Sequence, residues 1–318
     1  MTYTELVNSI QSYTENQFPT VYLADGTTQS STSQINRFIE QAEQRIYNTI
    51  QFPSLRANVT GVVTPTNPYL SCPNDFLSVY SIAVYATSGT YANSYFYLLN
   101  KDVNFIREAY PTPQATGTPK YYALFGPQYG NVAELSFLLG PTPDQAYNVE
   151  LHYYYYPPTI IQGAITALTV TAAGSGYVNG TYYDVPITGG NGNSATATLV
   201  VSGTGVTSIT PTTGGALFSV GDTVSVSNSY IGSSGSNFTA TVSTVSNATG
   251  TTWLGDNYDS VLLYGCLVEA YTFMKSEADI IAGIDGKYKE SLAEAKRLGD
   301  GLERQDAYRS GQYRQAVT

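Results

Sequence analysis

Histidine, cysteine, tryptophan and positive charge are all scarce in this chain. Its 318 residues include one His, two Cys and one Trp, and 14 Lys and Arg stand against 24 Asp and Glu. Cys72 and Cys266 lack metal-ligand spacing, which argues against a Cys/His metal site and a disulfide scaffold and is typical of a protein made in a reducing cytoplasm. The formal charge of −10 disfavours a protein that grips nucleic acid, because phosphate binding requires clustered Lys and Arg.

Long apolar runs are also absent. No stretch reaches the roughly 18 residues that a membrane-spanning helix requires. The amino terminus has no basic segment followed by an apolar one, as a signal peptide would have. The sequence therefore predicts no membrane span and no export signal.

Charge is distributed very unevenly along the chain. Residues 164–250 contain two charged residues, Asp184 and Asp222, whereas 19 of the 64 residues in 255–318 are charged. So abrupt a change in composition indicates a domain boundary. We expect a mixed helical host domain into which a β-rich domain is inserted. The predicted ranges are 1–160 with 250–318 for the host and 161–249 for the insert.

Helical periodicity is strongest at the two ends of the host domain, and residues 101–110 could form a further brief helix. One helix should begin near Thr2, whose side chain can form a capping box with Glu5, and another near Ser31. Asp256 or Asn257 should cap the first helix of the carboxyl-terminal part. We expect these helices to pack into one bundle that joins the two ends of the chain. The predicted helices cover residues 1–17, 33–51, 259–277 and 280–304.

Short β-type runs separated by Pro and Gly turns fill residues 57–157, which we expect to form an antiparallel β-region. The insert contains a degenerate repeat of about forty residues, which indicates one compact β-domain with pseudo-twofold symmetry. The predicted class is therefore α+β: a helical bundle, an antiparallel β-region and an inserted all-β, sandwich-like domain. The repeat consists of G-S-G-Y-V-N-G (174–180) with A-T-A-T-L-V-V (195–201), and of G-G-A-L-F-S-V-G (214–221) with T-A-T-V-S-T-V (239–245).

Few residues are suited to catalysis or to metal binding. His152 lies in an aromatic strand, and a catalytic histidine would need an orienting partner, so we expect a structural role. Glu40 and Glu43 lie one helical turn apart, and carboxylate pairs can perform acid–base work, but their polar neighbours favour a solvated helix face. Cys266 is expected to be a small buried apolar residue. We predict no enzymatic activity, no cofactor and no metal site.

Tyrosine is unusually abundant, with 29 residues. It supplies large amphipathic contact area at low entropic cost and suits extensive interfaces, but it also simply favours strands, and both interpretations stay open. The carboxyl-terminal segment combines Tyr with Arg, the residue types that anchor interfaces, and could be a docking peptide or a disordered terminus. The candidate docking residues are Arg304, Tyr308, Arg309, Tyr313 and Arg314.

Four motifs follow one another in the host domain. They are I-Q-F-P-S-L-R (50–56), L-S-C-P-N-D-F (70–76), V-E-L-H-Y-Y-Y-Y-P-P (149–158) and N-Y-D-S-V-L-L-Y-G-C-L-V-E-A-Y-T-F-M-K (257–275). Together they resemble the head-to-tail adaptor (connector) proteins of tailed bacteriophages, of the tail-tubular or gatekeeper type found in short-tailed phages. The resemblance covers residues 1–160 and 250–318, and L-L-Y-G-C-L-V-E-A is its most specific piece. The Gly- and Thr-rich insert is similar to β-modules of other virion proteins.

The resemblance implies a structural virion protein at the neck, the interface between head and tail, that is assembled in the host cytoplasm. About twelve copies would form a ring between the portal protein and the tail nozzle protein. The ring would extend the channel for genomic DNA and give a platform for the nozzle and for tail fibres. The carboxyl-terminal helix and its Tyr/Arg tail would dock onto the portal, and the resemblance assigns no role to the insert. We expect a net negative lumen, because Lys and Arg would hold the passing DNA.

Two other functions stay open. One is an adhesin or fibre-associated virion protein with a glycan-binding insert, which suits the Thr-rich repeat although Trp253 is the single tryptophan. The other is a virion-borne cell-wall hydrolase, which predicts turnover that is lost when Glu40 or Glu43 becomes Gln. Deletion of residues 164–248 separates the adaptor from the adhesin, since particles that assemble without adsorbing would identify the insert as adhesive.

Overall fold

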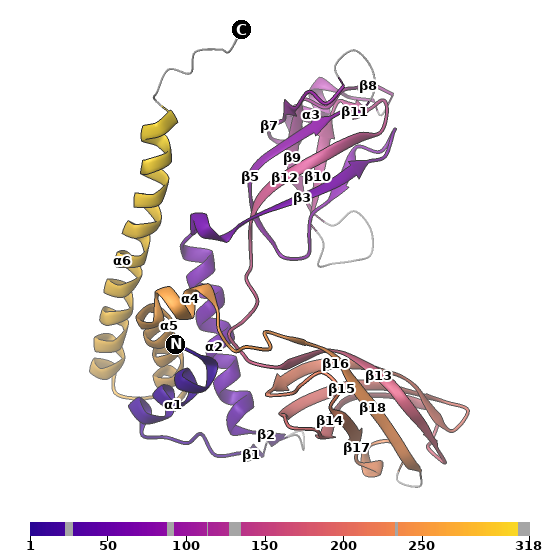
Figure 1. Cartoon of the computed structure of the whole chain (residues 1–318), viewed down its shortest axis with the longest axis vertical. Coiled ribbons are helices and arrows are strands. Elements are labelled where there is room, and N and C mark those ends of the chain that lie inside the picture. Colours follow the sequence, from indigo (N-terminus) through magenta and orange to yellow (C-terminus); the bar gives the residue numbers. More distant parts are fainter. Residues whose placement is uncertain (23–27, 88–91, 113, 127–134, 233–234, 311–318) are drawn as a thin grey trace. The chain divides into compact units, whose positions relative to one another are not determined.

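The chain divides into two compact units of different architecture. The first unit holds a helical bundle and a β-domain, and the second holds two sheets that share a core (Figure 1). The predicted α+β class is confirmed, while the division of the sequence into a host and an insert stays a prediction. The units are residues 1–50 with 158–301 and residues 51–157 with 302–318. The computed structural model describes residues 1–22, 28–87, 92–112, 114–126, 135–232 and 235–310, with the backbone alone for 28, 236 and 298–310.

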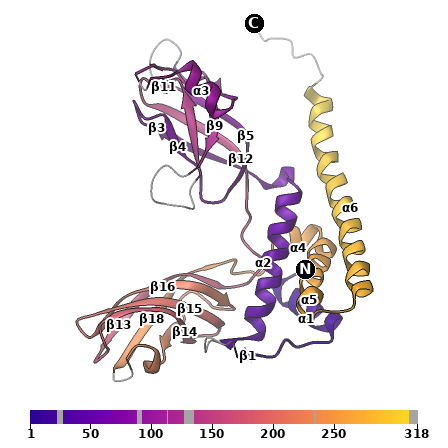
Figure 2. The same ribbon diagram turned by 180° about the vertical axis from the view of Figure 1, so that it is seen from behind.

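Helix α5 (Asp259–Phe273) is the centre of the bundle. Helices α1 (Tyr3–Thr14) and α2 (Ser31–Thr49) pack against it, and both views show α1 and α5 grouped beside α2 (Figures 1 and 2). Helix α6 (Ala278–Ser310) contacts α5 through the buried Tyr288. A Cβ atom on Gly265 of α5 would lie 3.3 Å from both Ala42 Cβ and Tyr288 Cε2, so this glycine allows α2 and α6 to approach α5 closely.

The amino-terminal helices begin at hydroxyl caps, one as predicted and one shifted. The capping box of α1 is confirmed, since the Glu5 amide donates to Thr2 Oγ1 over 3.3 Å and the Thr2 amide donates to Glu5 Oε2 over 2.8 Å. Helix α2 begins one residue earlier than the predicted cap implied. Its cap is Ser30 rather than Ser31, and Ser30 Oγ accepts the Ser33 amide over 3.1 Å.

The prediction that Asp256 or Asn257 caps α5 is wrong. Both residues lie inside a short preceding helix, α4 (Trp253–Asn257), which is capped by Thr252 through a 3.1 Å bond from the Gly255 amide. Helix α5 then begins after Tyr258 without a side-chain cap. Because Thr252 already starts a helix, the chain enters α5 through α4, and Asp256 and Asn257 lie within α4 instead of capping α5.

The second unit is built from two four-stranded sheets with one shared aromatic core. Phe76, Tyr153, Tyr122 and Phe137 meet in this core, with Phe137 edge-on to Phe76 and to Tyr122 at 5.6 and 5.8 Å between ring centroids. One sheet has the order β3 (Arg56–Val63), β12 (Tyr147–Tyr155), β5 (Phe76–Tyr85), β6 (Phe96–Tyr97), and the other has the order β4 (Tyr69–Ser71), β10 (Ser136–Gly140), β9 (Tyr121–Phe125), β7 (Leu99–Asn100). The smaller elements are η1 (Pro53–Leu55), α3 (Val103–Ala109), β8 (Thr116–Gly117) and β11 (Thr142–Pro143).

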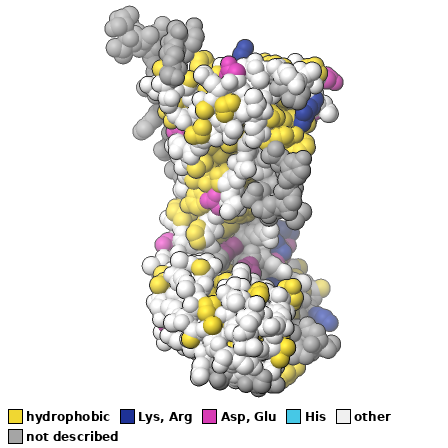
Figure 3. Space-filling view, turned by 90° about the vertical axis from the view of Figure 1, so that its right-hand side faces the viewer, with side chains coloured by type: hydrophobic (Ala, Val, Ile, Leu, Met, Phe, Trp, Pro, Cys, Tyr) yellow, Lys and Arg dark blue, Asp and Glu magenta, His cyan; other side chains and the backbone are white. Residues whose placement is uncertain are grey.

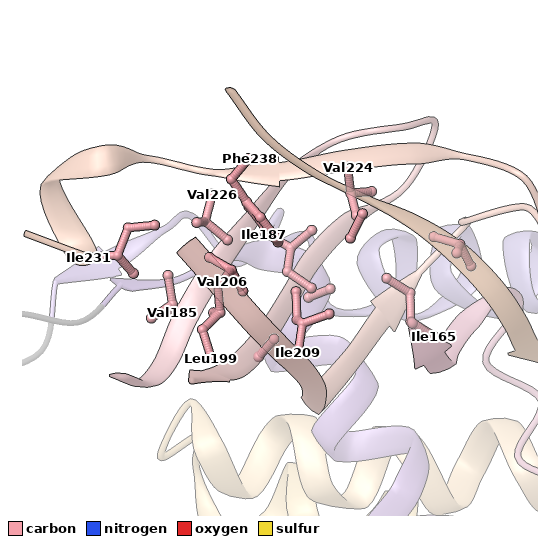
Figure 4. Packing of buried hydrophobic residues seen from close by; sticks show 14 of the residues in the cluster. Ile165, Val185, Ile187, Leu199, Val206, Ile209, Val224, Val226, Ile231 and Phe238 are labelled. Carbon is pink, nitrogen blue, oxygen red and sulfur yellow. The ribbon is translucent and has the colours of Figure 1, made fainter. Parts of the chain in front are cut away.

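The β-domain of the first unit is one antiparallel sheet of six strands folded around a buried aliphatic cluster (Figure 4). Its strand order is palindromic with respect to the sequence repeat. Exchanging the first three strands for the last three, in chain order, leaves the order of neighbours unchanged, which is the topology of a twofold repeat. The order is β13 (Ala164–Ser175), β18 (Ser236–Ser246), β17 (Thr223–Val226), β14 (Gly180–Gly189), β15 (Asn193–Ser202), β16 (Gly205–Ala216). The remaining elements of the first unit are η2 (Asn228–Tyr230) and the strand pair β1 (Val21–Tyr22) and β2 (Thr28–Gln29).

Two aromatic–glycine contacts join the halves of the β-domain. Tyr177, after the first strand of the first half, covers Gly235 of the second half, where an added Cβ would meet the Tyr177 ring. Phe218, after the first strand of the second half, covers Gly192 of the first half in the same way. Both rings are 3% exposed. Each half therefore completes the core of the other.

The outer surface of the β-domain is polar but almost uncharged. Pairs of hydroxyl side chains hydrogen-bond across neighbouring strands, as in Thr166 with Thr244 at 2.6 Å and Thr171 with Thr241 at 2.7 Å. In Figure 3 the face of this domain is largely white, the colour of uncharged polar side chains and backbone. Cross-strand hydroxyl pairs stabilise an exposed sheet without charge, which accounts for a domain with two charged residues.

Candidate functional site

The side of the β3-β12-β5-β6 sheet that faces away from the core carries a Tyr/Arg cluster. The Arg56 guanidinium carbon lies 4.0 Å from the Tyr80 ring centroid and 5.2 Å from that of Tyr154. Arg56 Nε and Nη2 also donate to the Tyr154 hydroxyl over 3.1 and 2.8 Å. Tyr154 is 6% exposed, whereas Tyr80 is 55% exposed. The cluster therefore presents a fixed aromatic ring to solvent, and Tyr and Arg are the residue types that dominate binding energy at interfaces.

A polar row lies beside this cluster on the same face. Ser81 Oγ lies 3.0 Å from His152 Nδ1, and His152 Nε2 lies 3.4 Å from Glu150 Oε1. Glu150 Oε1 also accepts a hydrogen bond from Asn58 Nδ2 over 2.8 Å. The imidazole thus has orienting partners, which the sequence did not reveal because Ser81 and Asn58 come from the strands on either side. A hydroxyl, an imidazole and a carboxylate can relay a proton, and on an exposed sheet face they also form the polar part of a binding surface.

Exposed aromatic residues continue the surface onto β6. Tyr95 and Tyr85 lie 4.8 Å apart between ring centroids, and Tyr95 is 50% exposed. The nearby Glu150 carboxylate is the main cause that raises the pKa of Tyr95 above its usual value, because a second negative charge would be repelled. Tyr97 of β6 is 65% exposed. We call the outer face formed by Arg56, Tyr80, Tyr95, Tyr97, Glu150, His152 and Tyr154 the Tyr/Arg face.

Strand β3 forms one edge of this sheet. It pairs with β12 in an unbroken register from Arg56 opposite Tyr154 to Val63 opposite Tyr147, and has no second neighbour among the strands that the structure describes. Val62 is 59% exposed. A long regular edge presents unpaired amide and carbonyl groups that can bind another chain. The edge of β3 and the Tyr/Arg face are thus adjoining candidate contact surfaces.

The prediction of a solvated face for Glu40 and Glu43 is wrong for Glu43. Glu43 is 4% exposed, and its Oε1 accepts the Ile160 amide over 2.9 Å, while the Thr159 side chain provides a further hydrogen bond. Burial raises the pKa of Glu43 to about 7, against the opposing effect of these two hydrogen bonds. Glu40 is exposed. Desolvation raises its pKa above the usual value, and the nearby Arg37 offsets only part of this effect. The pair therefore divides into one buried and one open carboxyl group.

Glu43 belongs to the junction that connects the bundle to the β-domain. Asn247, in the segment that leaves the β-domain, donates from Nδ2 to the carbonyl oxygens of Thr159 and Thr251, each over 2.9 Å. The Tyr3 amide of α1 donates to the Gly250 carbonyl over 2.8 Å. The two connecting segments are thus bonded to each other and to the helices, and Glu43 provides a buried polar contact between the entering segment and α2.

The sequence also raised the questions of Cys266, a metal site and a membrane span. Cys266 is fully buried in α5 as expected, and burial raises its pKa well above the usual value. Among the described residues, no group of three or more His, Cys, Asp and Glu could hold a metal ion. None of the helices in that part of the chain is both long and apolar enough to span a bilayer.

A family model for the SU10 adaptor protein matches residues 1–189. The chain belongs to this family. The match covers more than half of the chain and includes α1, α2, the whole second-unit β-region and the first strands of the β-domain. The adaptor is thus a bacteriophage structural protein and a component of the virion. No curated protein matches the chain.

The candidate docking residues of the adaptor lie at its carboxyl-terminal end, outside the matched range. Arg304, Tyr308 and Arg309 belong to the last turns of α6, where the structure describes the backbone. Tyr313 and Arg314 lie outside the described residues. The helical backbone places Arg304 and Tyr308 four positions apart, which is the spacing of neighbours on one helix face.

Proposed function

We propose that the adaptor forms a ring between the portal protein and the tail nozzle protein, in the manner of the short-tailed phages. About twelve copies, arranged by cyclic symmetry, would enclose the DNA channel and continue it from the head into the tail. The outer part of the ring would support the nozzle and tail fibres. Membership in a phage adaptor family supports a connecting role, and the finer position in the virion is the proposal.

The observation that carries the proposal is the combination of the Tyr/Arg face with the open edge of β3. A ring requires each copy to use two different surfaces, one toward each neighbour or partner. The Tyr/Arg face offers preorganised aromatic anchors, since Arg56 is held by both π contacts and hydrogen bonds. The β3 edge offers backbone groups that can extend the sheet across a contact. In the proposed ring, these two surfaces make the contacts between neighbouring copies and the contacts with the nozzle protein.

The charge distribution suits a channel that lets DNA pass. The net charge of −10 and the low content of Lys and Arg keep phosphate affinity low, because each bound phosphate needs a cationic partner. Arg56 and Arg107 are both hydrogen-bonded to tyrosine hydroxyl groups. The lumen of the proposed ring is net negative, and genomic DNA passes without specific binding. We also propose that the protein is not an enzyme and uses no cofactor.

Immunogold labelling of intact particles with an antibody against this chain tests the proposal directly. Gold at the neck, between capsid and tail, is the expected result. Gold at the fibre tips would instead establish the adhesin as the function. Particles from a host that expresses the chain without residues 164–248 provide the second comparison, since the adaptor role predicts a phenotype in assembly or tail attachment, whereas the adhesin role predicts complete particles that fail to adsorb.

The oligomeric state gives a second test. We propose that the isolated chain is a monomer or a weak oligomer and that the ring forms with the portal, because contact surfaces in such assemblies are completed by the partner. Native mass spectrometry of the chain with and without purified portal rings measures this. A stable isolated ring would contradict the dependence on the portal but would leave the ring itself intact.

A further inference from the structure

A cleft of about 960 Å³ lies within the first unit, between the first half of α2 and the β-domain. The helix contributes both buried and exposed polar side chains, and the β-domain contributes the start of β15, the end of β16 and the bend in β14. The volume is near the upper end of the ~300–1,000 Å³ range of ligand sites in proteins. Its lining includes Ser33, Asn36, Arg37, Glu40, Asp184 and Tyr230.

Hydrogen bonds fix the walls of this cleft. Ser30 Oγ, at the start of α2, is hydrogen-bonded to Ser194 Oγ of β15, so the helix end and the sheet are joined across one end of the cleft. Asn36 is 8% exposed, and its Oδ1 accepts the Tyr3 hydroxyl over 2.8 Å, which fixes the orientation of its amide. A site whose walls are already held in place loses little entropy when a ligand binds.

The lining combines hydroxyl and amide groups with apolar surface of similar extent. Serine, threonine, asparagine and glutamine account for most of the polar side chains, and each hydroxyl can both donate and accept a hydrogen bond. The charged groups are Arg37, Glu40 and Asp184, which is one cation against two carboxylates. This balance is wrong for phosphate or another strong anion, which requires an excess of cationic donors. The apolar residues of the lining are small or aliphatic and stand among these polar groups.

These features match the chemistry of a carbohydrate. Sugar hydroxyl groups alternate as donors and acceptors, and planar carboxylate, amide and guanidinium groups can bind two neighbouring hydroxyls at once. The Tyr230 ring is 52% exposed at the cleft, where an aromatic face can cover the C–H surface of a sugar ring. We propose that this cleft binds a neutral oligosaccharide, with Glu40 and Asp184 accepting hydroxyl hydrogen bonds, Arg37 donating them and Tyr230 covering a sugar ring.

The proposal concerns a site that the adaptor role does not require. A ring can form through the β3 edge and the Tyr/Arg face whether or not the cleft is occupied, so the two proposals can fail separately. The cleft would give the adaptor a carbohydrate-binding function on the first unit. The match to the adaptor family ends at residue 189 and leaves β15 and β16, which form one wall, outside it.

Isothermal titration of the full chain with maltotetraose, cellotetraose and chitotetraose tests the proposal. The expected result is saturable binding of at least one of these neutral tetrasaccharides. Glu40→Gln and Asp184→Asn should each weaken that binding about tenfold, since each removes a charged acceptor. Asp184 has a positive φ of 51°, a backbone conformation that asparagine adopts readily, so this variant retains the local fold. Ser33→Trp, which fills the cleft from the helix side, should abolish binding.

Glu290→Gln is the matched control, because Glu290 is an exposed carboxylate of α6 that does not line the cleft. It should leave the affinity unchanged. Two results would overturn the proposal. One is no binding of any tetrasaccharide at about 10 mM, a concentration that fills even a millimolar site. The other is binding that Glu40→Gln, Asp184→Asn and Ser33→Trp leave intact. Circular dichroism of each variant separates a lost site from a lost fold.

Discussion

The buried carboxylate of Glu43 in α2 accepts a hydrogen bond from the Ile160 amide over 2.9 Å, although 117 positions separate the two residues along the chain. This bond joins the central part of the bundle to the segment that enters the β-domain. Its environment determines how the stability of the first unit depends on pH.

Stability should fall as the pH rises from 5 toward 8 because of Glu43. Burial raises its folded-state pKa from 4.5 to about 7, so the folded state holds the proton more tightly than the unfolded chain does. The resulting stabilisation is complete below the unfolded pKa and is lost as the pH passes through the folded pKa. The change amounts to about 3 kcal/mol in order of magnitude. Thermal unfolding of the helices, followed by circular dichroism at several pH values, measures it.

Glu43→Gln keeps an amide oxygen for the Ile160 amide and removes the titration. The fall in its unfolding temperature across this window should be much smaller than in the parent protein, whereas that of Glu290→Gln should follow the parent protein. An undiminished pH dependence in Glu43→Gln would show that another group is responsible.

Gly192→Ala should destabilise the β-domain by about 1–3 kcal/mol, because the new methyl group would overlap the Phe218 ring. The added Cβ would also lie 2.6 Å from the Ala216 carbonyl oxygen. Gly180→Ala is the matched control, since its Cβ would make ordinary contacts of 3.8 Å with Tyr182. Differential scanning calorimetry of the two variants measures the difference. Equal unfolding temperatures would contradict the aromatic–glycine packing, and a smaller penalty in Gly192→Ala with Phe218→Leu would locate the overlap.

Arg56→Lys should lower the stability of the second unit by about 1 kcal/mol. Lysine lacks the planar guanidinium group that stacks on the Tyr80 ring while it donates hydrogen bonds to the Tyr154 hydroxyl. Urea unfolding followed by tyrosine fluorescence measures the loss. Arg107→Lys provides the comparison: Arg107 is exposed and makes one hydrogen bond, of 2.8 Å, to the Tyr69 hydroxyl. A loss in Arg107→Lys as large as that in Arg56→Lys would show that the stacked geometry is unimportant.

Val62→Lys should prevent ring assembly without unfolding the chain. The substitution places a charge on the open edge of β3, where it opposes pairing with another strand. Val220→Lys introduces the same charge at a similarly exposed valine of the β-domain, 64% against 59% exposed, and should assemble normally. Each variant is mixed with purified portal rings, and the number of portal rings that carry an adaptor ring is counted by electron microscopy. Rings of Val62→Lys at the parental yield would exclude the β3 edge as a contact between copies.

Simultaneous replacement of Arg304, Tyr308 and Arg309 by alanine should weaken portal binding more than tenfold, because Tyr and Arg anchors each contribute strongly at interfaces. The unfolding temperature should stay unchanged. Lys289→Ala is the control on the same helix, where Lys289 is 71% exposed and pairs with Asp285. Biolayer interferometry against immobilised portal rings measures the affinities. Equal affinity of the triple variant and the control would remove this end of α6 from the portal interface.

The features that the sequence predicted correctly depend on neighbours a few positions away. The Thr2–Glu5 capping box needs residues three positions apart, and the periodicity of α2 needs one helical face. The assignment of His152 to a strand likewise follows from the run of aromatic residues beside it. Local hydrogen bonds, helical periodicity and strand-forming residues leave their record in nearby positions, so these elements could be derived without the structure.

Only the tertiary structure decided the features that depend on distant partners. Glu43 is buried because residues 159–160 cover it, and its polar sequence neighbours had favoured a solvated position. His152 acquires Ser81 as a hydrogen-bond partner from the adjoining strand, and Gly192 meets Phe218 from the other half of the repeat. Likewise, the cleft exists only where α2 and the β-domain meet. Burial and polar satisfaction arise from contacts between segments far apart in sequence, whereas composition and periodicity record how each segment is built.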